Sequence, residues 1–131
     1  MLGRRGAAAA PAGEPAADAS IVHVGSVLGR RGRAGQAVYS ASKAGLEGLT
    51  RGLAAEYGPR GIRTNLVAPG WIATAMTDAY PADTVAEIRA RIPLGRLGSP
   101  DEVADAVMFL VTNRYMNGAT LTLDGGLASS L

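Results

Sequence analysis

Short runs of strand-forming residues, each closed by glycine or proline, alternate along this chain with longer stretches of helical spacing. The runs occupy residues 20–24, 62–68 and 120–123. Strands that alternate with helices favour a parallel sheet joined by right-handed crossovers. We therefore predict an α/β fold. Three strands are few for such a sheet, which indicates that the chain is part of something larger.

Helical spacing predicts helices over residues 37–57, 77–91 and 99–113, with Pro81 interrupting the second. Ser99 is a good N-cap for the third helix, because a proline and two acidic residues follow it. The segment between the first strand and the first helix is rich in glycine and arginine, and we predict a loop there. The first helix should bury a stripe of apolar residues, namely Leu46, Leu49, Leu53 and Ala54.

Residues 1–19 are low-complexity alanine, glycine and proline, which predicts a disordered segment ahead of a domain at 20–131. The segment contains Arg4 and Arg5 and has no acidic residue before Glu14, features typical of mitochondrial transit peptides. It lacks the serines and the apolar face of such a peptide. The expected compartment is therefore the cytoplasm, with the mitochondrial matrix as the alternative.

Composition argues against several classes of function. The chain has no cysteine and a single histidine, so thiolate and multi-histidine metal sites are not expected. A net charge of +2 without accompanying aromatic residues does not favour nucleic acid. No apolar run approaches the roughly 20 residues that span a bilayer, so we expect no membrane partner.

Ser26, Tyr39 and Lys43 form the candidate catalytic group. Tyr39 and Lys43 are four residues apart on one helix and should project about 6 Å apart on one face. Ser26 follows the first strand, at the edge where such sheets bind ligands. An ammonium beside a phenol favours proton transfer, and a serine hydroxyl can hold a carbonyl oxygen. A tyrosine and lysine at this spacing also occur by chance, although Lys43 is the only lysine among 13 basic residues.

The stretch IVHVGSVLGRRGRAGQAVYSASKAG, with the later Pro69-Gly70 and Asp124-Gly125-Gly126, resembles the short-chain dehydrogenase/reductase family. Within that family it is most similar to the 3-oxoacyl-acyl-carrier-protein reductases of fatty acid biosynthesis and to carbonyl reductases. The resemblance covers residues 20 to about 127. It implies a partial Rossmann-like doubly wound parallel sheet, comprising the last three strands and their helices.

The resemblance also implies roles for individual residues. Tyr39 would be the general acid or base and would also contact the cofactor. Ser26 would polarise the substrate carbonyl, and Lys43 would also bind the nicotinamide ribose. The cofactor would be NADP(H) or NAD(H), with NADPH favoured, and the substrate a small-molecule or carrier-linked ketone. Residues 75–95 would form a substrate lid, and the full-length form would be a homo-oligomer. The remaining implied sites are Pro69, Gly70, Ile72 and Thr74 for the cofactor and Arg60 for carrier docking.

The sequence departs from the family pattern on the N-terminal side. No stretch matches the glycine-rich turn that holds the cofactor pyrophosphate after the family's first strand. We therefore expect a domain truncated at its N-terminus, with an unpaired sheet edge at residues 21–25 and weak or no reductase activity. The alternative is a non-catalytic remnant that acts as a dimerisation or interaction module. The residues that distinguish NADPH from NADH would lie in the missing part.

Overall fold

The computed structural model describes residues 18–129. Most of the low-complexity segment expected at 1–19 lies outside this range, and the first strand begins at Ala19, one residue earlier than predicted. The elements in order are β1 (Ala19–Val24), α1 (Leu28–Arg31), α2 (Ala37–Tyr57), the short 3-10 helix η1 (Gly58–Arg60), β2 (Ile62–Pro69), α3 (Ala75–Asp78), α4 (Ala82–Ala90), α5 (Pro100–Thr112) and β3 (Thr120–Leu123).

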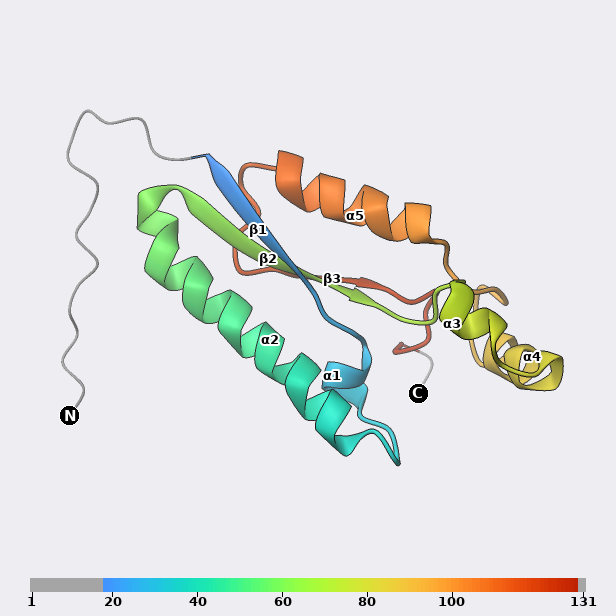
Figure 1. The fold of residues 1–131 in the computed structure, drawn as a ribbon. Coiled ribbons are helices and arrows are strands. Elements are labelled where there is room, and N and C mark those ends of the chain that lie inside the picture. The colour runs from blue at the N-terminus through green and yellow to red at the C-terminus, as the bar shows by residue number, and fades with distance from the viewer. Residues whose placement is uncertain (1–17, 130–131) are drawn as a thin grey trace.

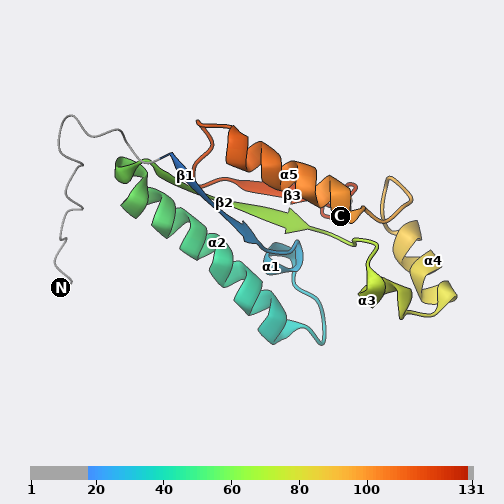
Figure 2. The same ribbon diagram turned by 45° about the horizontal axis from the view of Figure 1, so that its top comes forward.

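The described strands form one parallel sheet of three strands in the order β1-β2-β3, which confirms the predicted α/β fold. β1 pairs with β2 from Ala19–Ile62 to Val24–Val67. Helix α2 covers one face of the sheet and α5 covers the other (Figures 1 and 2). Within the part of the chain that is described, β1 is an edge strand, as expected.

The two crossover connections differ in hand. Each connection leads to the next strand in the same direction across the sheet, from β1 to β2 and from β2 to β3. The helix of the first connection, α2, and that of the second, α5, nevertheless cover opposite faces (Figure 1). Two parallel connections that run in the same direction across a sheet have the same hand only if their helices lie on the same face. The expectation of right-handed crossovers throughout was therefore wrong, because at least one of the two is not right-handed.

Both faces of the sheet combine buried apolar and buried polar residues. Val67 of β2 packs with Ala106 and Leu110 of α5, and all three are buried. On the opposite face, Nδ1 of His23 lies 2.8 Å from the hydroxyl of the fully buried Thr50. The predicted apolar stripe of α2 was partly wrong, because Leu49 is 48% exposed while Glu47, Thr50 and Ala54 are the buried residues of that helix.

A buried arginine on β2 ties the sheet to the end of α5. Arg63 is only 8% exposed. Its Nη1 donates to the carbonyl oxygens of Leu110 and Asn113 at 2.9 and 2.8 Å, and its Nη2 donates to that of Val111 at 2.8 Å. The last carbonyls of a helix lack partners within the helix and carry partial negative charge, so a guanidinium satisfies both needs there.

One local prediction differs from the structure, and another is confirmed. The glycine-rich loop after β1 contains the one-turn helix α1, which ends at Gly32 with a positive φ of 66°. The helical pattern predicted over residues 77–91, with an interruption at Pro81, is two helices, α3 and α4, on either side of Pro81, and the first begins at Ala75. Proline lacks an amide hydrogen and cannot continue a helix that is already formed. In the described part of the chain, no helix combines the length and apolar character required to cross a bilayer.

Candidate active site

Ser26 lies at the carboxyl end of the sheet, where the chain leaves β1. The amide of Gly25 donates to the carbonyl oxygen of Val67 at 2.7 Å, which extends the β1–β2 pairing to the residue before the serine. The Oγ of the half-buried Ser26 accepts a hydrogen bond from the amide of Leu28 at 3.2 Å. Because the hydroxyl is the acceptor in this bond, its own hydrogen remains available to a ligand.

Tyr39 and Lys43 stand in the first two turns of α2, as the spacing predicted. The Nζ of Lys43 lies 5.6 Å from the centroid of the Tyr39 ring. The same ammonium donates to the carbonyl oxygen of Val24 at 3.1 Å, which ties α2 to the end of β1 two residues before Ser26. The Tyr39 side chain is 43% exposed. The three predicted catalytic residues therefore belong to segments that are joined at one edge of the sheet.

The loop after β2 is held by the last strand and by the segment before α5. The amide of Gly70 donates to the carbonyl oxygen of Leu123 at 2.7 Å. A side chain at position 70 would come within 2.8 Å of the Cβ of Asp124, so only glycine fits this approach. The carbonyl oxygen of Pro69 accepts from the amide of Val27 at 3.1 Å, which joins this loop to the segment that carries Ser26.

The remaining predicted cofactor residues continue along the same loop. Ile72 forms an isolated parallel bridge with Gly98. Thr74 is the N-cap of α3 and makes a reciprocal capping box with Thr77. Both follow β2 at its carboxyl end, the same edge of the sheet as Ser26.

Arg60 does not lie with the others. It ends η1, beyond the C-terminus of α2, whereas Tyr39 is near the N-terminus of that helix. Since α2 has 21 residues, a rise of about 1.5 Å per residue separates its ends by roughly 30 Å. The guanidinium of Arg60 stacks 5.5 Å from the ring centroid of Tyr57. Arg60 therefore occupies the opposite end of the molecule from Tyr39 and Lys43.

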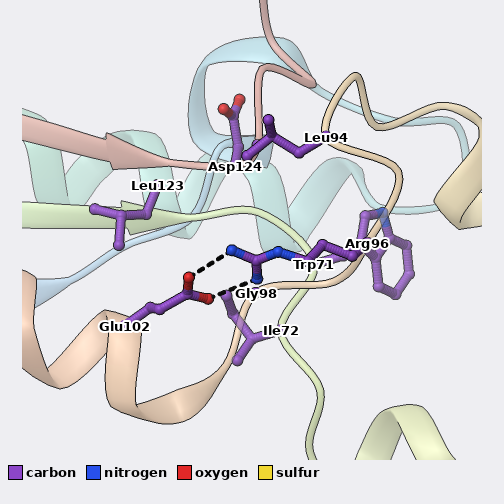
Figure 3. Close-up of a pocket in the computed structure, with 9 residues that line it drawn as sticks. Trp71, Ile72, Leu94, Arg96, Gly98, Glu102, Leu123 and Asp124 are labelled. Atoms are coloured by element: carbon purple, nitrogen blue, oxygen red, sulfur yellow. Dashed lines mark hydrogen bonds and ion pairs between the residues drawn. The ribbon is translucent and has the colours of Figure 1, made fainter.

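An ion pair beside the loop after β2 was not predicted from the sequence. The Nη2 and Nη1 atoms of Arg96 lie 2.6 and 2.9 Å from the Oε1 and Oε2 atoms of Glu102 (Figure 3). Glu102 also accepts from the amide of Ser99 at 2.8 Å, and Ser99 caps α5 in return. Gly98, between these residues, accepts from the amide of Ala73 at 2.8 Å. The pair therefore fixes the segment against which the loop after β2 rests.

A pocket of about 170 Å³ opens next to this ion pair. Its lining includes Trp71, Ile72 and Leu94 together with Arg96 and Glu102 (Figure 3). None of the predicted catalytic residues belongs to its lining. The pocket shares only Trp71 and Ile72 with the loop after β2 that was predicted to contact a cofactor.

The Arg96–Glu102 pair makes stability depend on pH. The hydrogen bonds from Arg96 lower the pKa of Glu102 from 4.5 to about 2. The stabilisation is therefore complete above pH 4.5 and disappears as the pH falls toward 2. We expect Glu102→Gln to lower the urea midpoint at neutral pH, and the difference from the unmodified protein to shrink through that acidic window. A difference that stays constant with pH would contradict this account.

The comparisons with known proteins cover most of the chain. A family model described as "Enoyl-(Acyl carrier protein) reductase" matches residues 6–128. Carbonyl reductase family member 4 of Danio rerio is 56% identical over 108 residues, and the human 3-oxoacyl-[acyl-carrier-protein] reductase is 49% identical over 108 residues. Each match covers 82% of this chain and 44% of the relative. The chain therefore spans less than half the length of the curated relatives that it matches.

A solved structure gives the same result for the fold. The crystal structure of 3-hydroxyacyl-CoA dehydrogenase type-2 from Mycobacterium avium superimposes with a TM-score of 0.79 at 42% identity. The match covers 82% of this chain and 42% of that one. Together with the family match and the parallel sheet flanked by α2 and α5, this similarity shows that the chain belongs to the short-chain dehydrogenase/reductase family of oxidoreductases.

Proposed function

We propose that this chain carries the proton-transfer part of an NAD(P)-dependent reductase that converts a ketone to an alcohol. The observation that best supports the proposal is the position of Lys43. Its ammonium lies beside the Tyr39 ring and is anchored to the carbonyl oxygen of Val24, at the end of the strand that leads to Ser26. Lys43 thus contacts both the Tyr39 phenol and the segment that carries the Ser26 hydroxyl.

The proposed reaction adds a hydride and a proton to the ketone, and each residue has one part in it. The Ser26 hydroxyl donates a hydrogen bond to the carbonyl oxygen of the ketone and orients it. Tyr39 gives its phenolic proton to that oxygen, while the carbonyl carbon receives a hydride. The phenolate that remains is stabilised by the Lys43 ammonium until a proton from solvent restores the phenol. The product is a secondary alcohol.

The residues present fit a nicotinamide cofactor, which supplies the hydride when bound. An ammonium has three donors, and Lys43 uses one of them on Val24. The other two are available to the hydroxyls of a ribose. Pro69, Gly70, Ile72 and Thr74 lie on the loop that would hold the nicotinamide end. NADPH is the cofactor that we favour, because the most similar relatives include 3-oxoacyl-[acyl-carrier-protein] reductases.

A 3-oxoacyl group linked to a carrier protein is the proposed substrate, by similarity to the same relatives. The lid over residues 75–95 would correspond to α3, α4 and the segment after them. Arg60 stays the proposed docking residue for an acidic carrier, at the far end of α2. Full-length relatives of this type are expected to work as homo-oligomers.

The experiment that tests the proposal is a chimera. Because the chain spans 44% of its relatives, we expect weak or no turnover from the 131 residues alone. Residues 20–131 should be fused to the part of the human relative that this chain does not match. We expect that fusion to reduce an acetoacetyl thioester with NADPH. A folded chimera that binds NADPH but shows no turnover would overturn the proposed activity.

A second candidate, a non-catalytic dimerisation or interaction module, is favoured by one observation. Met108, Phe109 and Val111 on α5 are 55%, 47% and 37% exposed, although all are apolar. Exposed apolar side chains on one helix are typical of interaction surfaces. Turnover by the chimera separates the two candidates, since a module without catalytic function would leave the fused protein folded but inactive.

A further inference from the structure

Arg33, Trp71 and Tyr80 form a cation–π and aromatic cluster at the edge of the sheet that carries Ser26. The guanidinium carbon of Arg33 lies 5.7 Å from the centroid of the Trp71 ring. The Trp71 and Tyr80 rings meet edge to face, with centroids 6.0 Å apart and an interplanar angle of 83°. Trp71 follows Gly70, and Arg33 stands in the loop between Ser26 and Tyr39. The cluster thus joins the two segments that carry the proposed site.

The charge of Arg33 has no carboxylate partner among residues 18–129. Some other arginines of the described chain do have one, such as Arg30 with Glu47 and Arg96 with Glu102. No hydrogen bond from the Arg33 guanidinium to another described residue is present either. The side chain is exposed and is held only by its contact with Trp71.

An arginine held over an aromatic ring by a cation–π contact still has N–H groups available to a ligand. Those donors form a fixed fork that matches the oxygens of phosphate or carboxylate. Stacking on Trp71 restricts the side chain in advance, so less conformational entropy is lost when an anion binds. Here the fork belongs to the segment between Ser26 and α2, six residues before Tyr39.

We propose that Arg33, braced on Trp71, binds an anionic group of the ketone substrate and so selects charged ketones over neutral ones. This inference rests on the proposed ketone reductase function and adds the substrate class. The anionic group is a phosphate, as in a coenzyme A or carrier thioester, or the carboxylate of a keto acid. Both would meet the same guanidinium fork.

Trp71 is the only tryptophan of the chain, so its fluorescence reports directly on this cluster. The 131-residue protein should be titrated with two matched pairs of ligands. Acetoacetyl coenzyme A is compared with S-acetoacetyl-N-acetylcysteamine, which lacks the phosphates. Acetoacetate is compared with its neutral ethyl ester. We expect the charged member of at least one pair to bind about tenfold more tightly, and the pair that responds identifies phosphate or carboxylate.

Arg33→Gln should abolish that difference. Arg31→Gln is the matched control, because it removes the same charge from an exposed residue two positions away. Equal losses in the two variants would indicate non-specific attraction and overturn the proposal. So would equal affinities for charged and neutral ligands, or no fluorescence response to any of the four. Circular dichroism verifies that both variants fold.

These titrations contain no cofactor and need no turnover, so their outcome is independent of catalysis. A chimera that fails to reduce ketones would contradict the proposed function, but the evidence for anion binding at Arg33 would be unaffected. A chimera that reduces charged and neutral ketones with equal kcat/KM would contradict the role of Arg33, but the proposed reductase function would be unaffected.

Discussion

Replacing Tyr39 with phenylalanine in the chimera is expected to lower kcat by about 10²- to 10⁴-fold, the usual contribution of a general acid. The ring would keep its place near the Lys43 ammonium, because phenylalanine has the same shape without the hydroxyl. Binding of NADPH should change little, since the lost group acts on the carbonyl oxygen. Steady-state kinetics with an acetoacetyl thioester and calorimetry with NADPH measure the two quantities.

Tyr57→Phe is the matched control for this variant. Tyr57 is the last residue of the same helix, about 30 Å from the N-terminal end by the length of α2. We expect its kcat to stay within about twofold of the unmodified chimera, because a distant phenol plays no part in the chemistry. A Tyr39→Phe variant that keeps full activity would show that the proton comes from another group.

Arg63→Met is expected to cost about 3 kcal/mol of unfolding free energy. Methionine fills the space of the stem but removes the donors that reach three carbonyl oxygens at 2.8 to 2.9 Å. A buried acceptor left without a partner costs about 1–3 kcal/mol. Urea unfolding of the 131-residue protein, followed by circular dichroism, gives the difference in midpoint.

Arg51→Met provides the comparison for an exposed arginine. Its guanidinium lies 3.6 Å from the carboxylate of Glu47, and its side chain is 61% exposed. Pairs of this kind contribute about 0–1 kcal/mol. If Arg51→Met and Arg63→Met shifted the urea midpoint equally, the cap at the end of α5 would not be the source of the stability.

The sequence was sufficient to predict the elements whose signals are local. The bounds of α2 at Ala37–Tyr57 and of β3 at Thr120–Leu123 agree with the expectation. Each element is followed by residues that end regular structure, Gly58-Pro59 after α2 and Asp124-Gly125 after β3. The capping box of α5 was readable from Ser99 and the acids after it. The proximity of Lys43 to Tyr39 followed from helical spacing alone.

Features that depend on contacts between distant segments could not be predicted in this way. Leu49 fits an apolar stripe by spacing, yet it is exposed, and the buried residues of α2 include Thr50, which contacts His23 of β1. The partner of Lys43 is a main-chain carbonyl oxygen, which no pattern of side chains reveals. The stacking of Arg33 on Trp71 joins two loops whose approach is set only when the sheet forms.

The placement of α2 and α5 on opposite faces leaves β2 without a side that faces water. Six consecutive residues of β2, from Arg63 to Ala68, are buried. Tolerance to substitution in this strand should therefore show no alternation between permissive and forbidden positions. Within the sheet, substitutions should be accepted more readily in β1 and β3 than in β2, which makes β2 a useful reference when distant members are aligned.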